Sequence, residues 1–223
     1  LAVVGPHKVT GMSDTASRRK IFTCRPTTAA DEAACATSIV QGLAARAFRR
    51  APTGREVTRL MAFYDTGRRG RTFEVGVTKA VEAVLASPQF LFRLENTPAT
   101  VKPGQPYRLA EVELASRLSF FLWAAGPDPV LLTAATQGKL ATSLQLETQV
   151  TRLLADPRSD ALATRFASQW LRLQDLDDVS PDPILFPYFD RTLSQALQKE
   201  TELFVASLVR DDRSVLDLLT ADY

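Results

Sequence analysis

The sequence contains very few of the side chains that bind metals or carry out redox chemistry. Its 223 residues include two cysteines, Cys24 and Cys35, and one histidine, His7. These are too few soft ligands for a zinc site within the chain, and the spacing of the cysteines excludes Cys-x-x-Cys redox chemistry. The sequence also lacks a Gly-rich phosphate loop, a Gly-x-Ser-x-Gly nucleophile elbow and a Cys-x-x-Cys-His haem-attachment motif. We therefore expect no metal and no cofactor in this chain.

Long apolar runs are also missing. No stretch approaches the roughly 18 to 20 consecutive apolar residues that cross a bilayer, so we predict no transmembrane segment. Residues 1–26 lack the charged start and apolar run of a signal peptide. The composition is nevertheless 45% hydrophobic, which predicts a substantial core. Because the chain opens inside the strand-like run LAVV, we interpret it as an interior piece of a longer polypeptide. A signal peptide could precede it in that polypeptide.

The net charge of +2 conceals an uneven distribution. Residues 1–110 carry 17 Lys and Arg against 8 Asp and Glu, whereas residues 111–223 carry 10 against 17. We interpret the resulting charges of +9 and −7 as two helical layers or neighbouring domains that face each other. Nucleic-acid binding fits less well, because the basic residues are spread over several helices without interleaved aromatic residues.

The apolar pattern predicts an all-α fold with two helical subdomains of antiparallel helices. Residues 1–26 read as a strand, the end of a preceding β module, followed by an extended loop. Residues 27–96 have the pattern of a three-helix subdomain, and residues 109–223 that of a second helical subdomain. Between them, residues 97–108 contain three prolines and a glycine, which favours a linker.

Capping patterns mark where the first two helices begin. Thr28 and Asp31 form one capping pattern, and Thr53 and Glu56 form another. After Thr28, apolar residues recur at helical spacing, and they are Ala36, Ile39, Val40, Leu43, Ala44 and Ala47. In the second half, we expect Asp156-Pro157 to separate two helices, and the last long helix to end near Arg210.

The two cysteines lie close enough to be joined. Cys24 precedes the predicted helix cap by about four residues, a stretch that reaches roughly 13 Å, and Cys35 lies roughly 10 Å up the helix. A disulfide is therefore sterically possible and would contribute on the order of 3 kcal/mol. It would imply an oxidising compartment, either periplasmic or extracellular. The alternative is a pair of reduced thiols, one of them buried as a small apolar residue.

Two carboxylate pairs are candidates for a general acid and base. Glu200 and Glu202 are two residues apart on a predicted helix, so they point to different faces and form a poor catalytic pair. Asp182 and Asp190 flank a proline-rich loop and could meet, although solvated or capping roles fit both residues better.

The remaining chemically distinctive residues are His7 and the two tryptophans. His7 follows the predicted strand and is interpreted as a plain polar residue, with axial ligation of a haem held by another part of the protein as the alternative. Trp123 and Trp170 fall on apolar helix faces, so we predict that both are core residues.

Several long segments resemble the central helical domains of a known family. The segments that carry the resemblance occur in the family's order and span nearly the whole chain: SDTASRRKIFTCRP, AFRRAPT, ASPQFLFR, LASRLSFFLWAAGPDPVLL, RLLADPRSDALATRFASQWLRL and FDRTLSQALQKETELFVASLVRDDRSVLDLLTADY. The family that they resemble is a planctomycete-type group of secreted, multi-domain, cytochrome-c-like proteins with consecutive domains of unknown function.

The resemblance implies neighbours that lie outside this chain. In the family, a β-sandwich similar to calcium-dependent carbohydrate-binding modules often precedes these helices, and LAVVGP looks like its last strand. Downstream domains carry a haem-attachment motif, so haem c is expected in other domains of the full-length protein. The family's paired cysteines match Cys24 and Cys35, which implies a structural disulfide. One departure is the stretch from Ala124 to Pro129, where the family has bulkier and more acidic residues.

Together these observations predict a helical scaffold segment of a larger secreted protein that acts in periplasmic or surface electron transfer. Its expected partners are other domains of the same polypeptide, a redox partner protein, and carbohydrate bound through the neighbouring module. The first alternative is a non-enzymatic module for partner binding or assembly. The second is a polysaccharide-associated enzyme that uses carboxylates such as Asp182 and Asp190, and whether the segment is an enzyme stays open.

Overall fold

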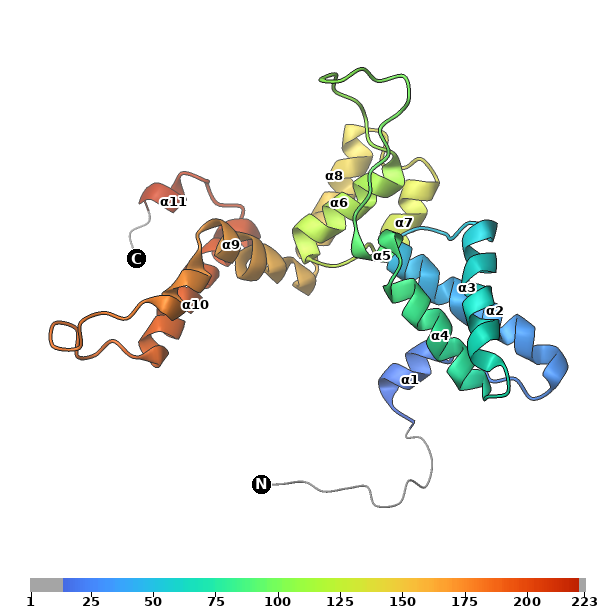
Figure 1. The fold of residues 1–223 in the computed structure, drawn as a ribbon. Coiled ribbons are helices and arrows are strands. Elements are labelled where there is room, and N and C mark those ends of the chain that lie inside the picture. The colour runs from blue at the N-terminus through green and yellow to red at the C-terminus, as the bar shows by residue number, and fades with distance from the viewer. Residues whose placement is uncertain (1–13, 221–223) are drawn as a thin grey trace, which may run out of the picture. The chain divides into compact units, whose positions relative to one another are not determined.

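The computed structural model describes residues 14–220, and within this range the chain folds into helices and loops without a strand (Figure 1). The predicted all-α fold is confirmed. The strand predicted at LAVVGP lies outside the described residues. None of the described helices is both long and apolar enough to span a membrane.

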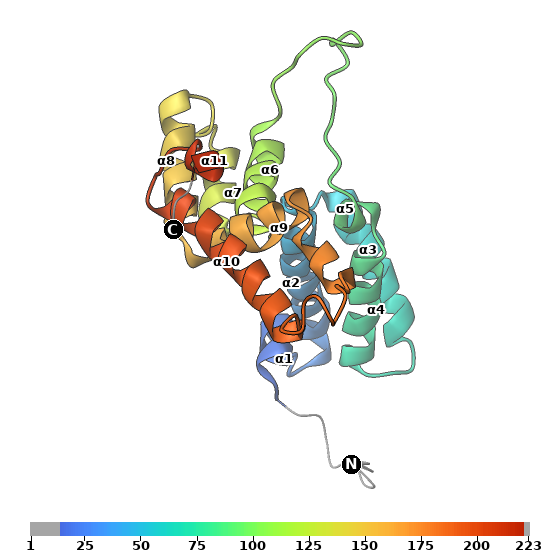
Figure 2. The same ribbon diagram turned by 90° about the vertical axis from the view of Figure 1, so that its left-hand side faces the viewer.

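The chain divides into two compact units between Leu94 and Glu95, and each is described by itself. The first unit contains five helices: α1 (Ala16–Ile21), α2 (Ala29–Phe48), α3 (Gly54–Arg68), α4 (Phe73–Leu85) and α5 (Pro88–Leu91). Helices α2, α3 and α4 pack side by side (Figure 2). Their shared core consists of Cys35, Ala36, Ile39, Val40, Ala44, Phe48, Leu60, Tyr64, Val77, Ala80 and Val84.

The helix α1 corrects one part of the sequence interpretation. We predicted an extended loop after the first strand, but Thr15 accepts a hydrogen bond from the Arg18 amide and starts a short helix there. Ile21 and the adjacent Phe22 then pack against the core of the first unit. The Thr15 cap and this packing together support a helix in a segment whose composition is typical of a loop.

Cys24 and Cys35 form a disulfide, with their Cα atoms 5.9 Å apart. Cys35 belongs to the buried core and Cys24 packs against it. The bond therefore fixes the segment between α1 and α2 to the side of α2. The predicted pairing is confirmed.

Two glycines allow α3 and α4 to approach each other closely. A Cβ atom on Gly76 of α4 would lie 2.7 Å from the ring of Tyr64, and one on Gly67 of α3 would lie 2.6 Å from the Lys79 side chain. The Tyr64 ring cannot move aside easily, because its hydroxyl donates a 2.6 Å hydrogen bond to Glu32. Gly67 is thus a packing position inside α3.

The second unit is built from α-helices joined by short 3₁₀ and π-helical segments. Its elements are α6 (Glu111–Trp123), α7 (Pro129–Thr136), α8 (Ser143–Ala155), η1 (Pro157–Asp160), the π-helix η2 (Leu162–Ala167), α9 (Ser168–Trp170), η3 (Leu173–Asp178), α10 (Arg191–Arg210) and α11 (Asp217–Thr220). Residues 97–108 contain turns and no helix. The core comprises Ala115, Leu122, Trp123, Leu131, Ala134, Ala135, Leu140, Leu153 and Leu162.

The close approach at Gly76 leads to a stability prediction. Gly76→Ala should lower the free energy of unfolding by about 1–3 kcal/mol, because the new methyl group overlaps the fixed Tyr64 ring. Gly42→Ala on α2 is the matched control, since no neighbouring atom lies within 4 Å of its new Cβ. This control should instead stabilise the protein by about 0.5–1 kcal/mol through helix propensity. Urea unfolding measures both changes, and equal effects would contradict the packing interpretation.

Candidate functional site

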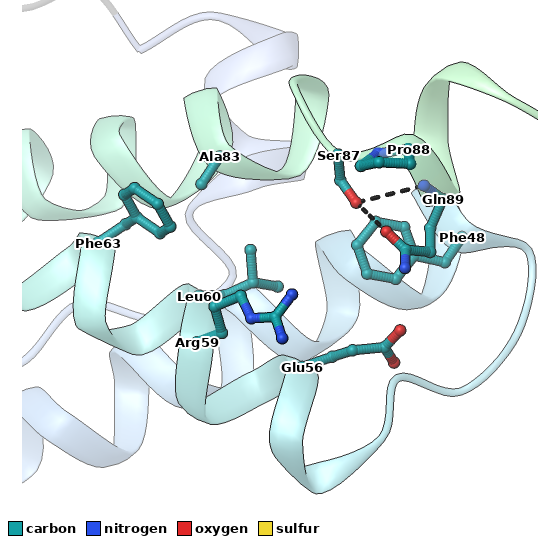
Figure 3. A pocket seen from close by; sticks show the side chains of 9 residues that line it. All are labelled: Phe48, Glu56, Arg59, Leu60, Phe63, Ala83, Ser87, Pro88 and Gln89. Carbon is teal, nitrogen blue, oxygen red and sulfur yellow. Dashed lines mark hydrogen bonds between the residues drawn. The ribbon is translucent and has the colours of Figure 1, made fainter.

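A pocket of about 140 Å³ lies in the first unit, between the ends of α2 and α4 and the middle of α3 (Figure 3). The side chains that line it are mostly apolar, with polar groups among them. The lining residues are Phe48, Glu56, Arg59, Leu60, Phe63, Ala83, Ser87, Pro88 and Gln89. Such a pocket has room for one large apolar group beside a few polar atoms.

The wall formed by α5 is held in place by Arg49. This residue adopts the left-handed conformation, with φ of 59°, at the end of α2. Its guanidinium donates hydrogen bonds to the carbonyl oxygens of Gln89 at 2.6 Å and Phe92 at 2.8 Å. Burial, together with the nearby charge of Arg93, lowers the pKa of Arg49. The pocket wall is therefore fixed by an arginine from another helix.

Glu56 is fully engaged in holding the start of α3. Its carboxylate accepts hydrogen bonds from the Thr53 amide at 2.7 Å and from both terminal nitrogens of Arg50 at 2.7 and 2.9 Å. The reciprocal hydrogen bond from the Glu56 amide to the Thr53 hydroxyl completes the predicted capping box. The hydrogen bonds from Arg50 are the main reason that the pKa of Glu56 falls to about 2. Glu56 is thus a structural anion rather than a proton donor.

Arg59 is the charged residue that the pocket offers to a ligand. It lies on the exposed face of α3, and no hydrogen bond or ion pair joins it to another part of the described chain. Ser87 and Gln89, by contrast, bond to each other across the pocket edge (Figure 3). The pocket can therefore take an apolar group that carries or adjoins a negative charge.

A second cluster of charged groups surrounds Trp123 in the second unit. The indole N–H of this buried residue donates a 2.8 Å hydrogen bond to the Leu153 carbonyl oxygen. The guanidinium carbon of Arg158 lies 3.5 Å from the centroid of the Trp123 ring, a cation–π contact. Arg152 also lies over the ring, at 5.8 Å. The prediction that Trp123 is a core residue is confirmed.

Each arginine of this cluster is held by an aspartate that caps a helix. Asp128 accepts a 2.8 Å hydrogen bond from the Leu131 amide at the start of α7, and it binds Arg152 through both oxygens at 2.8 and 3.1 Å. Burial opposes the charge of Asp128, but the hydrogen bonds from Arg152 and Leu131 outweigh it and lower its pKa.

Asp156 plays the same part at η1. It accepts hydrogen bonds from the side chain and the amide of Arg158, which lower its pKa to about 2. Two of the segments that carry the family resemblance, LASRLSFFLWAAGPDPVLL and RLLADPRSDALATRFASQWLRL, therefore meet around one tryptophan. The cluster joins α6, α7, α8 and η1 into one packed group.

The structure assigns most other candidate residues to capping or packing. The Asp182 carboxylate accepts a 2.8 Å hydrogen bond from the Ile184 amide. The Asp190 carboxylate accepts a 2.8 Å hydrogen bond from the Leu193 amide, so each aspartate caps local backbone. Glu202 pairs with Lys199 at 3.3 Å. No contact brings Asp182 and Asp190 together within the described residues.

Two candidate residues stand apart from this pattern. His7 lies outside the described residues. Trp170 was predicted as a core residue, but its side chain is 59% exposed, so that prediction is wrong. Its ring stacks on Phe166 at 6.2 Å, and Phe166 contacts Phe121 at 5.3 Å edge to face. This exposed aromatic row, Phe121, Phe166 and Trp170, includes a residue of the π-helix η2, a type of segment frequent at functional sites.

The arginines of the Trp123 cluster were missed by sequence analysis. The signal that could have found them is the Asp-Pro dipeptide at Asp128-Pro129 and Asp156-Pro157, which also occurs outside the cluster at Asp182-Pro183. We interpreted Asp156-Pro157 only as a boundary, but in both dipeptides of the cluster the aspartate is the N-cap and the proline is the first residue of a new helix.

Comparison with known families finds two consecutive matches. The family described as "PSD5: Protein of unknown function (DUF1595)" matches residues 35–95. The family described as "PSD4: Protein of unknown function (DUF1592)" matches residues 109–223, more than half of the chain. No curated protein and no solved structure matches the chain.

The Trp123 cluster leads to a prediction about stability. Asp128→Ala should lower the free energy of unfolding by about 1–3 kcal/mol, because it removes the cap of α7 and leaves Arg152 without its carboxylate. Asp177→Ala, on the exposed surface of η3, is the control and should change it by less than about 0.5 kcal/mol. Chemical denaturation followed by tryptophan fluorescence measures both, and equal losses would contradict the capping role.

The capping box at Glu56 leads to a prediction about pH. Its pKa in the folded protein is about 2, below the ordinary value of 4.5, so Glu56 stabilises the fold above pH 4.5. This stabilisation is lost as the pH falls from 4.5 toward 2. Glu56→Gln should therefore reduce the fall in unfolding free energy between about pH 6 and about pH 3.

Arg50→Gln tests the same interaction from the other side, because it removes the arginine that binds the Glu56 carboxylate and leaves the carboxylate in place. It should weaken the pH dependence in the same direction, and the double variant should add little to either single change. Urea unfolding at the two pH values is the measurement. Additive effects in the double variant would show that Arg50 does not act through Glu56.

Proposed function

Because the chain belongs to the family described as "PSD4: Protein of unknown function (DUF1592)" and carries a DUF1595 match before it, we propose a scaffold role within a larger secreted protein. In this proposal, the full-length protein is cytochrome-c-like and acts in periplasmic or surface electron transfer. The haem is covalently held by another domain, and the helices of this chain position that domain.

The disulfide between Cys24 and Cys35 is the observation that carries this proposal. Disulfides of this structural kind form and persist in oxidising compartments, whereas cytosolic thiols are kept reduced. The bond closes a short loop at the start of α2, one of the three helices that form the core of the first unit. The bond therefore supports a periplasmic or extracellular location.

The state of the carboxylates supports a scaffold role. The carboxylates with clearly shifted pKa values in the described part of the chain are Glu32, Glu56, Asp128 and Asp156, and all four pKa values are lowered by arginine partners. A general acid at neutral pH needs the opposite shift, which keeps its proton in place. These four groups therefore serve to hold helices together.

The exposed aromatic row, Phe121, Phe166 and Trp170, supports a docking role for the second unit. Contiguous exposed apolar groups of this kind commonly mark contacts with other protein surfaces. Phe166 stacks on Trp170 and meets Phe121 edge to face, so the three rings present a joined surface instead of three independent side chains. We place the neighbouring haem domain of the same polypeptide at this row.

The proposal is tested by a reduced-minus-oxidised absorption spectrum of the full-length protein isolated from its natural source. We expect the bands of covalently attached c-type haem. In the same preparation, Cys24 and Cys35 should resist alkylation under denaturing conditions until a reductant is added, which mass spectrometry can read out.

Each half of this experiment can fail separately. A spectrum without haem would overturn the electron-transfer role and leave a structural module. Free thiols in the freshly isolated protein would overturn the secreted location, whatever the spectrum shows. The Trp170→Ala variant tests the docking of the haem domain at the aromatic row. It should keep its haem, but limited proteolysis should release the haem domain more readily than from the unchanged protein.

A further inference from the structure

An apolar loop in the second unit is unusually exposed. The loop, residues 181–190, connects the segment after η3 to α10. Four large apolar side chains project from it: Ile184 is 86% exposed, Leu185 72%, Phe186 58% and Tyr188 88%. Single exposed apolar residues are common on protein surfaces, but a contiguous group of four is typical of an interaction site.

The apolar loop is held in one shape by its own backbone. The amide of Ile184 donates to the Asp182 carboxylate at 2.8 Å, and the amide of Phe186 donates to the Asp182 carbonyl oxygen at 2.8 Å. The amide of Phe189 donates to the Phe186 carbonyl oxygen at 3.1 Å. Three prolines, Pro181, Pro183 and Pro187, restrict the chain further. A loop fixed in this way loses little conformational entropy on binding.

The segment that carries the apolar loop is predominantly acidic, although Arg172 and Arg191 border it and Arg172 pairs with Asp175 at 2.6 Å. Residues 173–190 contain five aspartates and no lysine, arginine or glutamate. The aspartates are Asp175, Asp177, Asp178, Asp182 and Asp190. A surface that receives this loop should therefore be apolar at its centre and positively charged at its edge.

The pocket of the first unit has these properties. Its floor is apolar, and its volume of about 140 Å³ suits one large apolar side chain. The acidic residue of its lining, Glu56, is already paired with Arg50, whereas Arg59 lies at the edge without an acidic partner among the described residues. Residues 14–94 carry 14 Lys and Arg against 7 Asp and Glu, so the whole first unit attracts an acidic partner. The chain thus contains both halves of a complementary interface.

We propose that the apolar loop of one copy of this chain docks on the pocket of a second copy. One large side chain of the loop enters the pocket, and the loop's aspartates lie near Arg59. Because the loop and the pocket are different surfaces, the contact is heterologous, and copies join head to tail. The interface is small, so we expect weak association, with a dissociation constant in the micromolar range or above.

Sedimentation velocity of the whole chain over a range of concentrations is the first test. The sedimentation coefficient should rise with concentration, and added salt should reduce the rise. Leu185→Asp in the loop and Arg59→Glu in the pocket should each weaken association by about tenfold or more. The controls are Leu144→Asp, which replaces a leucine that is also exposed, and Arg25→Glu, which makes the same charge change elsewhere in the first unit. Both controls should associate like the unchanged chain.

Mixing the two interface variants is the decisive test. The Leu185→Asp copy keeps its pocket and the Arg59→Glu copy keeps its loop, so the mixture should form one-to-one pairs that grow no further. This recovery also shows that neither variant has lost its fold. A wild-type chain that stays monomeric at all concentrations overturns the proposal. So does a mixture that fails to pair, or a control variant that loses association as strongly as the interface variants.

Discussion

The pairing of a helix-capping carboxylate with an arginine is the interaction on which both units depend. Glu56 at α3, Asp128 at α7 and Asp156 at η1 each accept a hydrogen bond from a backbone amide at a helix start and bind an arginine with the same carboxylate. In the first turn of α2, Glu32 binds Arg68 and Tyr64 instead, which joins α2 to α3. A negative charge is stabilised at a helix N-terminus, so one group serves both the local helix and the packing between helices.

The sequence predicts those parts of the fold that have local causes. The caps at Thr28 and Thr53 are found where the sequence places them, because a cap and the amide it binds are three residues apart. The last long helix ends at Arg210, as its apolar spacing predicts. The disulfide is different: distance along the chain only allows it, and the resemblance to a family with paired cysteines indicates it.

The features that sequence analysis missed depend on contacts between distant segments. The apolar spacing around Trp170 correctly marks one helix face, but spacing cannot show whether another segment covers that face. The same limit applies to Gly67, which looks like a helix end until α4 is seen packed against it. The pocket is the clearest case, because its lining comes from α2, α3, α4 and α5, and only the fold brings Phe48 near Ser87.

The disulfide also determines how the first unit responds to mechanical load. A force that pulls on the chain before Cys24 passes through the two sulfur atoms directly into α2 at Cys35. Residues 25–34 form the loop that the disulfide closes, so they do not carry this force, and they include the Thr28 cap and Glu32. Tension applied at this point therefore bypasses the hydrogen bonds from Tyr64 and Arg68 to Glu32. In a segment placed between other domains, the bridge would let the helices carry strain without unravelling from the end that is pulled.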